Sequence, residues 1–290
     1  METFGEFWLE RRLDAGGQFA FFRATRLNHP YRMGGDPCVV LRAAQESARD
    51  RWPPWADPSV AKILRHPTIV QMLDDGEIDA YRYFSFEYVD GVDLRQLLNE
   101  VPLPPNAALT IIRTIVDALC VASEAVGLDG NPFEFLHGCI SPRWILVSRR
   151  GEVKLGGFGF GYIKPERERG LDDVFCAPEQ LRGGDQTAQT DMFQVGLLLH
   201  RMLFGSEFIS EGLARGRAKV AGHGVATATV TPDWGPQLEK LLRRLLAERP
   251  EDRFASITEV RDAIRSIADA EATSEGHRWL AAHASISETT

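Results

Sequence analysis

The stretch EFLHGCISPRWILVS, residues 134–148, carries the side chains with the clearest capacity for chemistry, among them His137 and Cys139. A loop cysteine with a lowered pKa can act as a nucleophile when a base stands beside it. An unperturbed thiol has a pKa of about 8.5 and is neutral at pH 7. No second histidine lies near Cys139 in the sequence. We therefore expect an inert thiol at this position.

Other motifs that would support catalysis or metal binding are missing from the sequence. It contains no G-x-S-x-G, no H-E-x-x-H and no Walker A lysine. The cysteines have neither C-x-x-C nor C-x-x-H spacing (Cys38, Cys120, Cys139 and Cys176). The sequence therefore indicates reduced thiols and no metal site.

The charge balance limits the partners of this 290-residue chain, which has a net charge of -8 and a pI near 5.5. Nucleic acids and anionic membrane surfaces attract clustered Lys and Arg, which this chain lacks. The N-terminus has no basic start followed by an apolar run, and no apolar stretch reaches the roughly 20 residues that span a bilayer. We expect a cytoplasmic protein without nucleic-acid binding or membrane insertion.

The elements that must position these side chains fall into two parts. Short β-branched and aromatic runs predict strands over residues 7–13, 19–25, 38–44, 68–73 and 81–89. Asp57 as N-cap and Pro58 at the first helical position predict one helix within this part. The first part of the chain is therefore expected to be a small β-rich lobe.

Helical spacing of apolar residues dominates the second part. It predicts helices over residues 106–126, 190–205, 236–250 and 256–268. The last of these opens with a capping box, Ser256 to Glu259. The final twenty or so residues lose this periodicity and are expected to be a tail. The predicted fold class is α+β, with an N-lobe over 7–88, a C-lobe over 89–268 and a C-terminal tail over 269–290.

The order of elements and motifs resembles the eukaryotic-type (serine/threonine) protein kinase family. FEYVDGVDLRQLL resembles the hinge, HGCISPRWILV the catalytic loop and VKLGGFG the metal-binding turn. CAPEQL, DMFQVGLLLHRMLFG and RPEDRF resemble the A-P-E element, the central helix and the late arginine motif. The resemblance implies a bilobal protein-kinase-like fold, with a small antiparallel β lobe carrying one helix and a larger, mainly helical lobe.

The resemblance also implies that the catalytic positions are replaced. Gly157 stands where the D-F-G aspartate binds Mg²⁺, and Trp144 stands where the second metal ligand, an asparagine, belongs. Cys139 occupies the position of the catalytic base, and Ser141 that of a phosphate-contacting lysine. We expect no catalytic residues and no bound ATP or Mg²⁺.

The nucleotide cleft implied by the resemblance is degenerate in the same way. One glycine of the Gly-rich loop remains, Gly16, and Phe21 and Val40 are larger than the residues that usually border adenine. Arg42 takes the place of the strand lysine, and its role is left open. The implied cleft residues are Gly16, Phe21, Val40, Arg42, Phe86, Glu87, Val89 and Leu146, with Phe86 at the gatekeeper position.

A structural set is implied beside these degenerate positions. His137 and Phe158, with Met72, match an apolar column of the kinase core. Glu179 is expected to pair with Arg253, and Asp191 to bond the backbone of the catalytic loop. These residues are read as framework rather than chemistry.

The function expected from this pattern is that of a pseudokinase, an inactive kinase-like domain that binds or regulates another signalling protein. One alternative is an unconventional kinase-like phosphotransferase with residual ATP-dependent activity, in which Arg42, Glu152, Asp172 or Asp173 recruits metal. Another is a non-catalytic sensor of a nucleotide or small molecule. Trp52 and Trp55 flank a stiff Pro-Pro pair that is expected to pack on the small lobe, with a recognition edge as the alternative.

Overall fold

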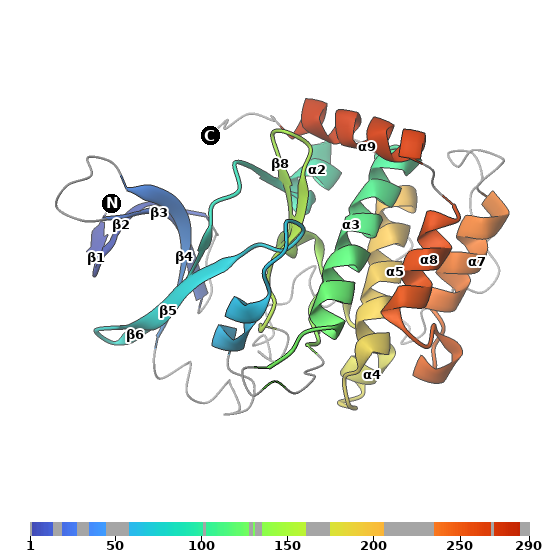
Figure 1. Ribbon diagram of the computed structural model, residues 1–290, viewed down its shortest axis with the longest axis horizontal. Coiled ribbons are helices and arrows are strands. Elements are labelled where there is room, and N and C mark those ends of the chain that lie inside the picture. The colour runs from blue at the N-terminus through green and yellow to red at the C-terminus, as the bar shows by residue number, and fades with distance from the viewer. Residues whose placement is uncertain are drawn as a thin grey trace.

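The computed structural model describes residues 2–13, 19–27, 35–44, 58–100, 103–127, 130, 135–160, 175–205, 235–267 and 270–284. These residues form a β-rich lobe beside a larger helical lobe (Figure 1). The predicted bilobal α+β fold is confirmed.

The N-lobe is a six-stranded antiparallel sheet with the strand order β1-β2-β3-β4-β6-β5. Its strands are β1 (Glu2–Phe4), β2 (Phe7–Arg12), β3 (Phe19–Arg26), β4 (Asp36–Ala44), β5 (Met72–Ile78) and β6 (Tyr81–Glu87). β5 begins later than predicted, because Thr68 and Val70 bond to β9 instead. The Val70 amide donates to the Leu155 carbonyl, and the Leu155 amide donates to the Thr68 carbonyl. The strand predicted over 68–73 thus belongs partly to a contact with the other lobe.

The strand register divides the apolar side chains of the N-lobe between the two faces of the sheet. Leu41 on β4 lies opposite Phe21 on β3 and Phe84 on β6. These three pack into the core shared with the helical lobe. Because side chains alternate along a strand, Val40 lies on the other face, in a second cluster with Phe7.

A short 3-10 helix stands where the N-lobe helix was predicted. Within the described residues it is a 3-10 helix, η1 (Pro58–Ile63), with Pro58 and Ala61 buried. Asp57, the predicted N-cap, lies outside the described residues. The chain then enters the C-lobe through β7 (Gly91–Asp93) and α2 (Leu94–Glu100).

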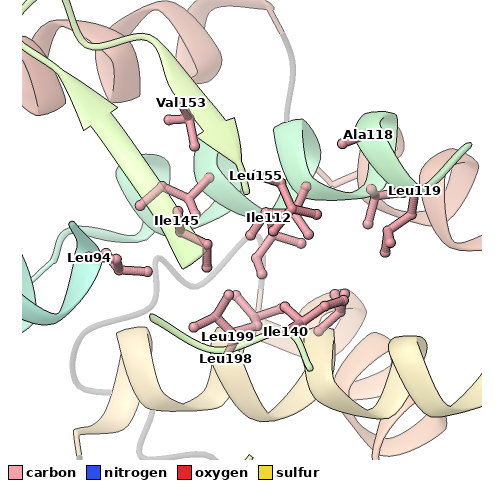
Figure 2. Packing of buried hydrophobic residues seen from close by; sticks show 14 of the residues in the cluster. Leu94, Ile112, Ala118, Leu119, Ile140, Ile145, Val153, Leu155, Leu198 and Leu199 are labelled. Atoms are coloured by element: carbon pink, nitrogen blue, oxygen red, sulfur yellow. The ribbon is translucent and has the colours of Figure 1, made fainter. Parts of the chain in front are cut away.

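The C-lobe is built around α3 (Pro105–Ser123), which lies beside α5 (Ala188–Phe204) (Figure 1). A small sheet, β7-β8-β9, with β8 (Ile145–Ser148) and β9 (Val153–Leu155), packs over α3. Figure 2 shows how Ile145 and Leu155 from this sheet meet Ile112 of α3 and Leu198 of α5. By length and apolarity α3 could cross a membrane, but it is the central core helix here and most of it is buried.

Three shorter α-helices and two 3-10 helices lie in the described part of the C-lobe beside α3 and α5. They are α4 (Pro178–Leu181), α7 (Gly235–Leu245), η4 (Pro250–Asp252) and α8 (Ile257–Arg265), with η2 (Pro142–Trp144) before β8. The predicted cap of α8 is present, because the Ser256 hydroxyl accepts from the Glu259 amide at 3.2 Å.

The predicted tail is wrong for much of its length. Residues Ala270–His283 form α9, which lies across α3 (Figure 1). Gly276 allows the close approach, since a Cβ there would lie 2.1 Å from Oγ1 of Thr110. Leu280 is fully buried, and Arg113 donates to the Thr273 hydroxyl at 3.1 Å.

Candidate functional site

The segment 137–140 is held by side chains of α5. The carboxylate of Asp191 accepts from the amides of His137 at 2.8 Å and Gly138 at 2.7 Å. Gln194, one turn further along α5, accepts from the Ile140 amide at 2.8 Å. These contacts fix the backbone on which the candidate site is built, and they are the ones expected of Asp191.

Two glutamine side chains add a second layer around Gly138. Gln180, on α4, donates to the Gly138 carbonyl at 2.7 Å, and Gln194 donates to the same oxygen at 3.2 Å. Gln194 also donates to Oε1 of the Gln180 side chain at 3.0 Å. The network connects the A-P-E element to the candidate catalytic loop. The sequence analysis did not predict a role for either glutamine.

Cys139 lies beside His137, which the sequence did not suggest would act as its partner. The Cys139 sulfur is 3.6 Å from Nδ1 of His137, while Nε2 of His137 donates to the Gly156 carbonyl at 2.7 Å. Burial lowers the pKa of His137 to about 4. Nδ1 is therefore an acceptor on a neutral ring that is too weak a base to take the thiol proton at neutral pH. The geometry favours the inert thiol over the nucleophile.

The two replaced metal positions touch each other. Gly157 has φ +84°, and a Cβ on it would lie 2.4 Å from Cδ2 of the Trp144 ring. Glycine offers no side-chain ligand, and the one polar atom of an indole is a donor. The resemblance to protein kinases implies a magnesium nucleotide at this place, and the residues present do not fit it.

Within the described ranges, no group of three or more His, Cys, Asp and Glu side chains could hold a metal ion. Glu152, one of the carboxylates considered for metal recruitment, is exposed on the turn after β8, where it accepts from the Ser148 hydroxyl at 3.2 Å. Asp172 and Asp173 lie outside the described residues, as do Gly16, Trp52 and Trp55.

Five aromatic rings form a continuous set of contacts between the lobes, and we call them the aromatic bridge: Phe21, Phe84, Phe86, Trp144 and Phe160. The Trp144 ring stacks on Phe160 with centroids 5.9 Å apart, and Phe21 meets it edge-on at 5.8 Å. Phe160 in turn contacts Phe84 at 5.4 Å and Phe86 at 6.0 Å. Phe160 was not predicted as a site residue, although its position two residues after Phe158 was a usable signal.

Val40 and Arg42 do not line the cleft, which corrects the prediction for both. Val40 is fully buried in the cluster on the opposite face of the sheet. Arg42 pairs with Glu2 at 2.6 Å, and its guanidinium lies over Phe22 at 4.9 Å and Tyr81 at 4.7 Å. The register turns Val39, Leu41 and Ala43 toward the shared core instead. None of these three side chains carries a charge, so this face of β4 presents no counterpart of the strand lysine.

The hinge residues lie where the sequence placed them, at the end of β6 and just beyond it. Glu87 accepts from Nζ of Lys154 on β9 at 2.7 Å and from the Gln71 amide at 2.8 Å. Val89 and, on β8, Leu146 are half-buried. Their role as a nucleotide cleft stays a prediction.

The structural set is assembled as the resemblance implied. Arg253 donates to both carboxylate oxygens of Glu179, at 2.7 and 2.9 Å, and Thr190 donates to one of them at 2.9 Å. Burial opposes ionisation of Glu179, yet these hydrogen bonds leave its pKa below the ordinary value. Phe158 packs on the His137 ring with centroids 4.7 Å apart, and Met72 is buried in the same core.

Known proteins share both the sequence pattern and the fold. The model of the protein kinase domain matches residues 43–264. Tyrosine-protein kinase MasK of Myxococcus xanthus is 27% identical over 92% of this chain and 43% of its own length. Serine/threonine-protein kinase PknB of Mycolicibacterium smegmatis is 27% identical over 82% of this chain and 40% of its own. The chain thus spans less than half the length of these two relatives.

Solved structures give the same answer for the fold. The crystal structure of the Mycobacterium tuberculosis PknI kinase domain, C20A mutant, has a TM-score of 0.67 to this chain at 24% identity. The match covers 92% of this chain and 98% of that domain. Because the family model covers most of the sequence and the fold agrees, this chain belongs to the protein kinase domain family.

Proposed function

We propose that this chain is a pseudokinase, an inactive kinase-like domain that works in the cytoplasm as a binding or allosteric module for another signalling protein. The observation that carries the proposal is the contact between Trp144 and Gly157. Both positions that supply metal ligands in the family are occupied by groups without an oxygen ligand, and they pack against each other.

The other catalytic positions support the same conclusion. Cys139 offers a neutral thiol in place of a carboxylate base, beside an imidazole whose pKa is lowered to about 4. The face of β4 that meets the shared core presents Leu41 and Ala43 and no lysine. Loss of a positioned base costs about 10² to 10⁴ in rate, and loss of metal ions removes several kcal/mol of transition-state stabilisation. Together these deficits leave no route to phosphoryl transfer at a useful rate.

The intact structural contacts of the domain support a binding role rather than a general loss of function. The Glu179–Arg253 pair and the contacts from Asp191 to the loop backbone are intact. A chain that keeps buried charges paired while its chemistry is replaced still presents a defined surface. That surface is what we propose the partner binds.

A melting experiment tests the proposal, with ATP added alone, with Mg²⁺, and with Mg²⁺ plus EDTA. We expect the melting temperature to stay unchanged in all three. A ligand at 100 times its Kd adds about 2.7 kcal/mol of stability, so binding would be visible. A shift that EDTA abolishes would overturn the proposal in favour of a metal-dependent phosphotransferase, and label transfer to a protein substrate would confirm that alternative. A shift without metal dependence would favour a nucleotide sensor.

A further inference from the structure

The aromatic bridge crosses from one lobe to the other twice. Phe21 on β3 touches Trp144 of the C-lobe, and the stack then continues to Phe160. Phe160, which follows the β9 strand of the C-lobe, returns to the N-lobe through Phe84 and Phe86 on β6. Two different strands of the small lobe are therefore held by one continuous set of rings.

The rings of the bridge are withdrawn from water to different degrees. Phe84, Phe86 and Phe160 are buried, whereas Phe21 and Trp144 are half-buried at the outer end. Aromatic pairs at these separations attract beyond the area that they bury. Moving the lobes apart would expose the stack to water and break the ring contacts at both crossings.

A second set of contacts between the lobes lies next to the bridge. Lys154 of β9 pairs with Glu87 at the end of β6, and Val70 and Thr68 bond to Leu155. Glu87 directly follows Phe86, and Leu155 precedes Gly156, whose amide donates to the Trp144 carbonyl at 2.7 Å. These polar contacts therefore adjoin the bridge and hold the same parts of the two lobes together.

We propose that the aromatic bridge locks the two lobes closed without a ligand. In hinge-closing proteins a bound ligand supplies the contacts that hold two lobes together, and here the side chains of Phe21, Trp144 and Phe160 supply them. The inference deepens the proposed function and rests on it, because a locked cleft suits a module that presents one fixed arrangement to its partner. The partner then acts on the domain by binding the closed form or by breaking the bridge.

Neighbouring residues on β3 offer a matched pair of variants. Phe21 and Phe22 are both half-buried phenylalanines, but Phe22 points into the separate cluster of the N-lobe and lies under Arg42. Phe21→Ala removes one crossing of the bridge, whereas Phe22→Ala removes an equal volume from the opposite face of the same strand. The difference between the two isolates the interlobe contact from general loss of packing.

The interlobe distance is the quantity to measure, by electron paramagnetic resonance between two spin labels. Noncanonical amino acids at the exposed positions Glu77 of the N-lobe and Asp185 of the C-lobe carry the labels. We expect a narrow distance distribution in the ligand-free parent and in Phe22→Ala, and a broader, longer one in Phe21→Ala. Equal distributions in all three, or a broad one in the parent, would overturn the inference.

A second variant guards against loss of folding. If Phe21→Ala does not give a cooperative melting transition, Trp144→Ala removes the same contact from the C-lobe side and is measured in its place. Addition of magnesium ATP to the parent separates the two proposals. A melting shift that depends on the metal would contradict the proposed function. Whether the aromatic bridge holds the lobes closed is tested only by the interlobe distances in the variants.

Discussion

Gly157 and Trp144 depend on each other sterically. The indole ring occupies the volume that any side chain at position 157 would need, with contacts of 2.4 and 2.7 Å to a Cβ placed there. The Trp144 ring can therefore take its position only because residue 157 has no side chain, and so no metal ligand. Restoring one ligand alone meets a steric barrier as well as a chemical one.

That dependence predicts non-additive stability. Gly157→Asp should lower the melting temperature by several degrees, because its Cβ meets an aromatic ring. Adding Trp144→Asn should restore part of the loss, with a coupling of about 0.5 to 3 kcal/mol, the range for residues in contact. Calorimetry on the two single variants and the double variant gives the cycle. Strictly additive effects would mean that the ring moves aside freely.

The buried imidazole predicts a dependence of stability on pH. Burial lowers the pKa of His137 from 6.5 to about 4 in the folded state, so between these values the unfolded chain binds more protons. Stability from this group is complete above pH 6.5 and falls as the pH drops toward 4, by on the order of 3 kcal/mol in total. Urea unfolding at pH 7 and pH 5 measures the change.

A variant without the imidazole is the control for that prediction. His137→Phe keeps a buried ring at this position and should show a shallower loss of stability between pH 7 and pH 5. Burial also lowers the pKa of His200, so some dependence should remain. Identical slopes in the parent and in His137→Phe would assign the whole effect to other groups.

Strand β4 shows why the cleft residues could be predicted only in part. The run CVVLRAA is apolar on both faces, so period-two alternation does not say which face meets the C-lobe. Motif matching placed Arg42 in the cleft, and the register placed it against Glu2. An offset of one residue moves every side chain of a strand to the other face of the sheet. The face is determined by the pairing of Leu41 with Phe21 and Phe84, which lie outside the motif.

Helix α9 was missed for a related reason. Its buried contacts are with α3, and they depend on Gly276 allowing a close approach rather than on a broad apolar stripe. The helices α3, α5, α7 and α8 were predicted because their apolar stripes or runs are long. A helix held by a small residue leaves a weaker signal in the sequence.

The pairing of α4 with the segment before α8 predicts a contrast between framework and loop. Arg253 is fully buried and bonds Glu179, so Arg253→Ala leaves a carboxylate without its partner. Breaking a buried pair in this way costs about 3 to 5 kcal/mol. Cys139→Ala removes a half-buried thiol with a weak hydrogen bond and should cost about 1 kcal/mol or less.

Side-by-side calorimetry of the parent, Arg253→Ala and Cys139→Ala makes that comparison. We expect a melting temperature lowered by several degrees in the first variant and nearly unchanged in the second. If Arg253→Ala melts like the parent while Cys139→Ala abolishes a measurable activity, the loop is the working part and the pseudokinase proposal is wrong.

At the scale of the whole molecule, the two lobes were predictable and the contact between them was not. Each lobe is specified by local periodicity and by motifs that lie close together in the chain. The aromatic bridge joins Phe21 to Trp144 and Phe160 across more than a hundred residues. No pattern within one element indicates which aromatic rings will meet across a cleft.

Because catalysis in this family draws on both lobes, we predict that restoring the C-lobe alone will not create a kinase. Cys139→Asp alone, and Cys139→Asp with Gly157→Asp and Trp144→Asn, should both lack metal-dependent label transfer. Residues that act as a unit are strongly non-additive, and the face of β4 toward the shared core still carries Leu41 and Ala43 and no lysine. Adding Ala43→Lys is the step at which metal-dependent binding of ATP should first appear, measured as a melting shift that EDTA abolishes.

Adding Arg42→Lys instead is the matched control, because that position faces Glu2 on the far side of the sheet. If Arg42→Lys restores binding and Ala43→Lys does not, the register assigned to β4 is wrong, and with it the reason given for the missing phosphate contact.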